Sequence, residues 1–275
     1  MTTPQLTDIA TLQGILQKAN IQLSPDKSQH YLISPEVVEA TVALAKEGPK
    51  VITELGAGLG TLTQGLVSFK PRIRAIERDR NVAQLLLTLL PPDKRSLVEV
   101  VNKDLRDVDW TWPQPYQVVG NIPYAFSGLI IRRLTQLDPA PTQAILLVQK
   151  EVGDRLTAQA GDMTLVSLAM QLWGSAQQVL FVPKSCFEPE PAVDSALIYM
   201  IPHSPQKYSL AQREEVLKLA KIFFQGKRKQ MGGVLRKQFK REDSETLLAS
   251  VGLTLQQRPQ ELTTDQWVKL CGILK

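Results

Sequence analysis

The stretch Val51-Ile-Thr-Glu-Leu-Gly-Ala-Gly-Leu-Gly60 decides the fold. It reads as a short apolar strand that enters a loop with glycine at every second position, ahead of a helix over 61–68. Glycines in such a loop let the backbone turn sharply and approach a ligand closely. A strand, a glycine loop and a helix in this order predict the start of an α/β domain that binds its ligand beyond the end of the strand.

Strands and helices alternate downstream of this loop. We expect strands at 72–76, 97–101, 116–120 and 143–149. Helices are expected at 81–90, 127–137 and 151–159. This alternation predicts a doubly wound, Rossmann-like α/β sheet.

The flanking segments carry their own signals. Upstream, helices are expected over 6–19 and 35–46, the second with Ser34 as N-cap and Pro35 at its first position. Two later strands, 176–182 and 196–201, are candidates for a hairpin. Beyond Pro202 the sequence becomes basic and helical, which predicts a domain boundary within 201–209.

The composition excludes several classes of protein. Two widely spaced cysteines, Cys186 and Cys271, and two histidines predict neither a disulfide framework nor a metal site. No apolar run reaches the length of a membrane span, and the N-terminus lacks the features of a signal peptide. We therefore expect a cytoplasmic protein without metal. A net charge of +5 and a pI near 9.1 favour a polyanionic partner.

Three carboxylates lie at the ends of successive predicted strands. Glu54 precedes the first glycine of the loop, Glu77 follows the next strand, and Asp104 follows the third. Glu77 is placed to accept from both hydroxyls of a ribose, and Asp104 to accept from an adenine amino group. The set fits S-adenosylmethionine better than NAD, because residue 61 is Thr and the dinucleotide pattern G-x-G-x-x-G is incomplete. The alternative is that Glu77 and Asp104 are solvated loop residues.

A polar and aromatic tetrad, Asn121-Ile122-Pro123-Tyr124, follows the apolar run 116–120. An Asn that accepts and donates hydrogen bonds, a rigid Pro and an aromatic face at a strand end suit the binding of a planar base with an amino group. This pattern predicts a nucleic-acid amino-methyltransferase. The alternative is that Tyr124 only caps the sheet.

Six motifs in this order resemble the KsgA/RsmA family of small-subunit ribosomal RNA adenine N6,N6-dimethyltransferases, to which the Erm methyltransferases are related. They lie at Ser28–Leu32, Glu54–Thr63, Asn121–Tyr124, Val148–Arg155, Phe187–Ser195 and Phe224–Lys229. The resemblance covers nearly the whole chain. It implies a class I methyltransferase fold with a small all-α C-terminal domain, and S-adenosylmethionine as the cofactor.

The resemblance also implies roles for individual residues. The methyl-donor site would be lined by Gln29, His30, Leu32, Glu54, Gly56, Gly58, Glu77, Asp104, Leu105 and Asn121. Transfer to the target adenine would involve Asn121, Ile122, Pro123, Tyr124 and Phe187. Phe187 lies among prolines, so packing is the alternative to stacking on the base. The basic element Lys227-Arg228-Lys229 would contact RNA phosphates.

The expected organisation has three parts: 1–33, an N-terminal helix and donor-site loop; 34–202, the methyltransferase domain; and 203–275, a helical, basic RNA-binding domain. The expected substrate is ribosomal RNA in a small-subunit precursor, modified by a monomer. Departures from the family pattern at Ser28, Ala125 and Gly232-Gly233 leave substrate choice open. The alternatives are an Erm-like enzyme of large-subunit RNA, an RNA-binding assembly factor and a small-molecule methyltransferase.

Overall fold

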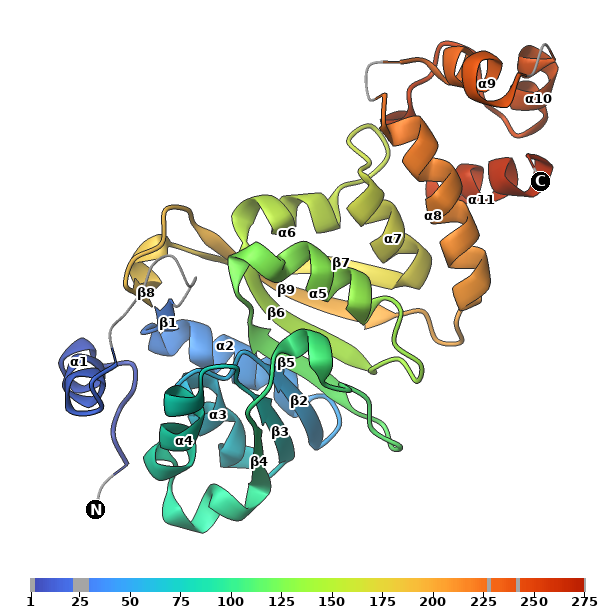
Figure 1. The fold of residues 1–275 in the computed structure, drawn as a ribbon. Helices are drawn as coiled ribbons and strands as arrows, with labels where there is room; N and C mark the ends of the chain where they lie inside the picture. The colour runs from blue at the N-terminus through green and yellow to red at the C-terminus, as the bar shows by residue number, and fades with distance from the viewer. Residues whose placement is uncertain (1–2, 22–29, 227–228, 241–242, 275) are drawn as a thin grey trace. The chain divides into compact units, whose positions relative to one another are not determined.

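A computed structural model of the chain describes residues 3–21, 30–226, 229–240 and 243–274. Its first compact unit comprises 1–153 and 177–202 and is built on a seven-stranded sheet (Figure 1). The sheet has the order β4-β3-β2-β5-β6-β9-β7. The strands are β2 Val51–Leu55, β3 Arg72–Ile76, β4 Val98–Val101, β5 Gln117–Asn121, β6 Gln143–Gln149, β7 Gly174–Val182 and β9 Ser195–Pro202.

The first five strands of the sheet are parallel, and β9 runs antiparallel to β6. The order reverses between β2 and β5, since the chain first builds outward to β4 and then returns to the other side of β2. The predicted doubly wound sheet is therefore confirmed. The two late strands predicted as a hairpin are neighbours at one side of the sheet.

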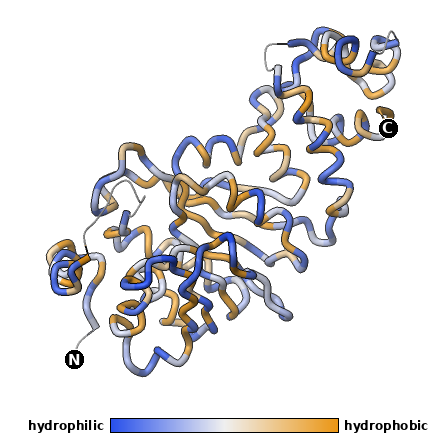
Figure 2. Tube along the Cα trace, viewed as in Figure 1, coloured by the Kyte–Doolittle hydropathy of each residue, from blue (hydrophilic) through white to orange (hydrophobic). Residues whose placement is uncertain are grey.

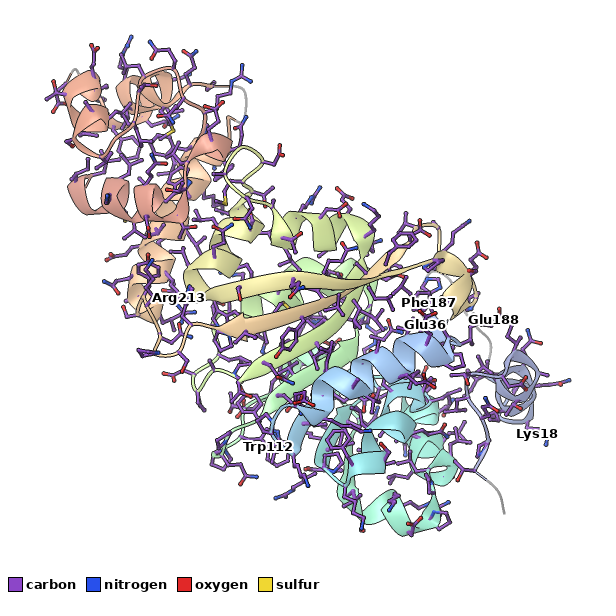
Figure 3. All side chains as sticks on the ribbon, turned by 180° about the vertical axis from the view of Figure 1, so that it is seen from behind. Lys18, Glu36, Trp112, Phe187, Glu188 and Arg213 are labelled. Carbon is purple, nitrogen blue, oxygen red and sulfur yellow. The ribbon has the colours of Figure 1, made fainter. Side chains whose placement is uncertain are left out.

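Helices cover both faces of the sheet. In Figure 1, α5 (Ser127–Leu134) lies in front of the strands, whereas α2 (Pro35–Lys46) lies in front when the molecule is seen from behind in Figure 3. Val37, Val42 and Ala45 of α2 pack with buried strand residues such as Val119 in one apolar cluster. Helices on both faces bury the central strands of the sheet, which is why the sequences of these strands are largely apolar.

Of the remaining helices of this unit, two place apolar residues (Leu62, Leu66 and Leu86) in the same cluster as the strands. These remaining helices are α1 (Ile9–Lys18), α3 (Thr61–Leu66), α4 (Arg80–Leu89) and the start of α6 (Lys150–Thr157). The side chain of Asp8 caps α1 by accepting from the backbone N–H of Thr11. Away from the main sheet, β1 (Tyr31–Leu32) pairs antiparallel with β8 (Phe187–Glu188).

The second compact unit comprises 154–176 and 203–275, so it also includes a segment upstream of the boundary that the sequence indicated. Its helices are α7 (Leu165–Trp173), α8 (Leu210–Phe224), α9 (Met231–Phe239), α10 (Ser244–Ser250) and α11 (Thr264–Ile273). Phe223 meets Trp267 edge-on, at 5.6 Å between ring centroids, in its core. Hydrophobic and hydrophilic residues alternate along α8 and α11 in Figure 2, as in helices with one buried face. The expected helical C-terminal region is confirmed.

Helix α7 is one of the elements that the sequence did not predict. Its sequence, LVSLAMQLW, is apolar nearly all round, and Leu168, Met170, Leu172 and Trp173 are all buried. A short, nearly continuous apolar run does not distinguish a buried helix from a buried strand, so the sequence pattern alone did not identify this helix. The helix begins at a capping box, in which Thr164 and Ser167 bond each other's backbone N–H.

None of the helices in the described ranges combines the length and the apolar character that crossing a bilayer requires.

Candidate active site

The carboxyl ends of four strands meet at one edge of the sheet. Leu55 pairs with Ile76 on one side and with Gly120 on the other, and Ile76 pairs with Val101. A cavity of about 530 Å³ opens there. Among its lining residues are those predicted for the donor site and for the tetrad: His30, Leu32, Glu54, Gly56, Gly58, Glu77, Asp104, Leu105, Asn121, Ile122, Pro123 and Tyr124. Gln29 lies outside the described residues.

The glycine loop forms one wall of this cavity. Gly56 and Gly58 have φ of 68° and 57°, in the left-handed region that favours glycine. A Cβ atom on Gly56 would lie 3.1 Å from the backbone oxygen of Asn121. The loop therefore needs glycine at this position both for its backbone conformation and for its close approach to the tetrad.

Glu54 is a buried carboxyl group at the base of the loop, only 1% exposed. Its Oε2 accepts a hydrogen bond from the Thr63 hydroxyl at 2.8 Å, whereas Oε1 has no hydrogen-bond partner in the described chain. Burial raises the pKa of Glu54 to about 8. The cavity thus contains an unpartnered carboxyl oxygen, which can accept from a cationic group once Glu54 has given up its proton.

Glu77 is held by backbone donors. Oε2 accepts from the N–H of Gly58 at 3.0 Å, and Oε1 accepts from the N–H of Asp79 at 2.8 Å. Burial raises the pKa of Glu77, and these hydrogen bonds oppose the rise. Glu77 is therefore not a solvated loop residue, and each oxygen keeps lone pairs for a pair of hydroxyl groups.

Asp104 is held by arginine instead. Arg106 donates to Oδ1 through Nε and to Oδ2 through Nη2, each at 2.9 Å, and its backbone N–H also reaches Oδ1. Arg78 lies 3.7 Å from Oδ2. The hydrogen bonds from Arg106 lower the pKa of Asp104 to about 2. Asp104 is thus ionised at neutral pH.

The orientation of the Asn121 side chain follows from its partner. Nδ2 donates to the backbone oxygen of His30 at 3.0 Å. Because a carbonyl oxygen can only accept, this contact fixes the amide group and leaves Oδ1 as the acceptor at the cavity. His30 is fixed in turn, since its Nδ1 donates to the backbone oxygen of Pro189 at 2.7 Å.

Tyr124 is positioned at both ends of its side chain. The ring stacks on His30 with 5.7 Å between centroids and 24° between planes, and the hydroxyl lies 2.5 Å from the Ser195 hydroxyl. Burial raises the pKa of Tyr124, so its hydroxyl stays neutral. Tyr124 lines the cavity, as the prediction for the tetrad requires.

Phe187 is placed differently from the expected stacking role. It is 2% exposed, belongs to the main apolar cluster and is not among the residues that line the cavity. Alternate side chains of a strand point to opposite sides, and in β8 the phenyl ring faces the core while Glu188 is partly exposed (Figure 3). The structure therefore favours the packing alternative for Phe187.

The expected RNA-contacting element is described only in part. Lys227 and Arg228 lie outside the described residues, whereas Lys229 is exposed in the segment that leads into α9.

Several residues of the cavity wall were not predicted. Tyr31 packs beneath the glycine loop, where a Cβ atom on Gly58 would lie 3.3 Å from its ring. Phe126, Arg106, Trp110 and Arg133 line the side around Asp104. Tyr31 belongs to the motif Ser28–Leu32, so the sequence offered a signal that could have placed it at the cavity. Arg106 and Arg133 act through backbone and carboxylate contacts that have no spacing signature.

The described residues contain no group of three or more His, Cys, Asp or Glu that could hold a metal ion.

The strand order, the glycine loop and the cavity at the strand ends define an enzyme with the Rossmann-like class I methyltransferase fold. The family model described as "Ribosomal RNA adenine dimethylase" matches residues 5–275. The chain belongs to this family, which confirms the resemblance seen in the motifs.

Curated relatives agree with this assignment. The chain is 35% identical over 257 residues to "Ribosomal RNA small subunit methyltransferase A" of Synechococcus sp. (strain CC9902), covering 88% of this chain and 92% of the relative. It is 32% identical over 261 residues to the protein of the same name from Trichormus variabilis, covering 90% and 96%.

Two solved structures share the fold. A dimethyladenosine transferase from Plasmodium falciparum superposes with a TM-score of 0.75 at 21% identity, covering 87% of this chain and 95% of that one. The 23S rRNA methyltransferase ErmE superposes with a TM-score of 0.71 at 22% identity, covering 88% of this chain and 98% of that one. At these identities the likeness concerns the fold alone.

Proposed function

We propose that this enzyme uses S-adenosylmethionine to dimethylate N6 of adenines in small-subunit ribosomal RNA during ribosome assembly. The observation that carries the reaction type is the fixed Asn121 amide, which presents Oδ1 to the cavity beside the Tyr124 ring. The names of the curated relatives support the small-subunit substrate.

The residues around the cavity fit this donor. A cavity of about 530 Å³ is of the size that small-molecule cofactors occupy. Glu77 would accept from the two ribose hydroxyls, Asp104 from the adenine amino group, and the unpartnered Oε1 of Glu54 from the ammonium group. When bound, S-adenosylmethionine supplies a methyl group activated by a positively charged sulfur.

The tetrad would prepare the target amine. An adenine amino group is a weak nucleophile because its lone pair is conjugated with the ring. Asn121 Oδ1 and the Ile122 carbonyl oxygen would accept its two N–H bonds and favour a pyramidal nitrogen. Holding the amine in line with the methyl group contributes several kcal/mol without a strong general base. The released proton passes to water, since the pKa of the cationic product amine is low.

Base stacking would complete the target site. The Tyr124 ring offers a face to an unpaired or flipped adenine, and such stacking contributes about 1–3 kcal/mol per base. Dimethylation also requires the site to accept N6-methyladenine, so it must leave room beside the amine. Lys227, Arg228 and Lys229 would contact phosphates, which makes RNA binding fall steeply with salt.

The experiment offers labelled donor and enzyme two substrates: undermethylated small subunits and naked large-subunit RNA. We expect N6-dimethyladenine only in the small-subunit RNA, mapped by mass spectrometry of nuclease fragments. Label only in large-subunit RNA would establish the Erm-like alternative. RNA binding without any donor binding by calorimetry would favour an assembly factor.

The variant Asn121→Ala tests the role of the Asn121 amide in methyl transfer. We expect transfer to fall by a factor on the order of 10³, because both the fixed acceptor and the tie to His30 are lost. RNA binding by filter retention should stay within about twofold, since phosphate contacts supply most of its affinity. Unchanged turnover would remove Asn121 from the mechanism.

A further inference from the structure

In the turn that follows Asp104, several backbone carbonyl oxygens accept hydrogen bonds from a side chain outside the turn. The guanidinium group of Arg133 donates to three of them: Nη1 to the oxygens of Leu105 and Arg106, and Nη2 to that of Val108. The second of these bonds is 3.0 Å long. One planar cation therefore satisfies three acceptors in the loop that carries Asp104.

Trp110 supports the same guanidinium group from one side. Its ring lies 4.5 Å from the guanidinium carbon of Arg133, and its Nε1 donates to the Leu105 oxygen at 3.1 Å. The indole is 1% exposed, so this cation–π contact is shielded from water. Leu105 is thus held by two side chains at one oxygen.

The far end of the loop is anchored independently. The hydroxyl of Thr53 in β2 donates to the Trp110 backbone oxygen and accepts from Nε1 of Trp112, both at 2.8 Å. The guanidinium of Arg74 lies 4.2 Å from the Trp112 ring (Trp112 is labelled in Figure 3). Arg133 therefore acts on the end of the loop that is nearest to Asp104.

Arg133 belongs to α5, the helix that begins three residues after the tetrad. Ile130, Ile131 and Leu134 of α5 are buried, so the helix is a rigid base for the side chain. The contacts of Arg133 thus join the strand end that carries Asp104 to the strand end that carries Asn121. The neighbouring Arg132 is exposed and does not line the cavity.

We propose that Arg133 is a positioning residue that holds the Asp104 loop at the place where Asp104 reads the amino group of the donor's adenine. This inference rests on the proposed function, since it assumes that the cavity binds S-adenosylmethionine. Lysine cannot replace this arginine fully, because an ammonium group lacks the planar fork that spans separated carbonyl oxygens.

The test measures recognition of the amino group. S-adenosylhomocysteine and its inosine analogue, which has a carbonyl oxygen in place of the amino group, are titrated calorimetrically into the wild type, Arg133→Ala, Arg133→Lys and Arg132→Ala. A hydrogen bond to a charged group predicts that the wild type prefers the adenine form by about tenfold or more. We expect Arg133→Ala to lose most of this preference, Arg133→Lys to keep part of it, and Arg132→Ala to keep all of it.

The outcomes separate the two proposals. Failure of the wild type to bind S-adenosylhomocysteine would overturn the proposed function itself. If a folded Arg133→Ala protein prefers S-adenosylhomocysteine over the inosine analogue as strongly as the wild type does, only the role of Arg133 would be overturned. A general loss of stability would weaken both ligands equally, so the ratio of their affinities distinguishes positioning from unfolding. If Arg133→Ala does not fold, the ratio in Arg133→Lys decides: a ratio equal to that of the wild type contradicts the proposal.

Discussion

The two sides of the cavity hold their carboxyl groups in opposite ways. Beside the glycine loop, Glu54 and Glu77 are held by a hydroxyl group and by backbone N–H groups, and burial raises the pKa of both. One strand further out, Asp104 is held by arginine and its pKa falls to about 2. Carboxyl groups near neighbouring strand ends therefore differ in charge: burial favours the protonated form of Glu54 and Glu77, whereas the hydrogen bonds from Arg106 keep Asp104 ionised.

The largest effect that would test this contrast is expected at Glu54. Its folded pKa of about 8 exceeds the usual 4.5, so the folded protein binds more protons than the unfolded chain between these values. The contribution of Glu54 to the stability of the ligand-free protein should therefore be fully present below about pH 4.5 and be lost, on the order of a few kcal/mol, as the pH rises towards 8. Glu54→Gln should abolish this part of the slope, measured by urea unfolding at several pH values. An unchanged slope in the variant would contradict the buried, protonated state.

The same substitution at Glu77 sharpens the contrast within one side of the cavity. Glu77→Gln places an NH₂ group against one of the two backbone N–H donors that the carboxylate now accepts from. We expect the affinity for S-adenosylmethionine to fall by about 10- to 100-fold. The reason is that the hydrogen bonds from the ribose hydroxyls to a charged carboxylate are worth about 1.5–3 kcal/mol. Calorimetry at pH 7 measures this affinity, with Glu99→Gln on the outer strand β4 as a control that should bind normally. Wild-type affinity in Glu77→Gln would exclude the ribose role.

The smallest effect is expected on the arginine side. Arg106→Ala removes the main cause of the low pKa of Asp104, which should rise from about 2 towards the usual 3.8. A lowered pKa stabilises the folded protein above the unfolded value and ceases to do so as the pH falls towards 2. Because the Arg106 side chain is 56% exposed, solvent screens this interaction, and the loss of stability at pH 7 should be small. NMR titration of the Asp104 carboxyl carbon measures the pKa directly, and a value that stays near 2 would assign the shift to another group.

Local signals predicted much of the fold. The bounds of α2, β2, β3 and β6 agree with the sequence prediction, because caps, prolines and apolar runs mark them in the chain itself. Neighbouring parallel strands also bring their carboxyl ends to one edge, which made Glu77, Asp104 and Asn121 predictable as a group. No assignment of α7 was made, since a short apolar run such as LVSLAMQLW is compatible with a buried helix and with a buried strand.

Other features depend on partners that local sequence does not reveal. The direction in which Phe187 points follows from the pairing of β8 with β1, which joins distant parts of the chain. The contacts of Arg133 are to backbone oxygens, and any residue type supplies those. Side chains that recognise a backbone conformation leave no pattern that a single sequence can display.

The short pairing of β1 with β8 has a consequence for protein synthesis. His30 bonds Pro189, which lies 159 residues further along the chain, and His30 in turn holds the Asn121 amide. Closing so long a segment is entropically costly and is expected late in folding. While Pro189 is still inside the exit tunnel of the ribosome, a nascent chain lacks the partner that holds His30, so we expect the cavity at the strand ends to be completed only after most of the enzyme has been translated.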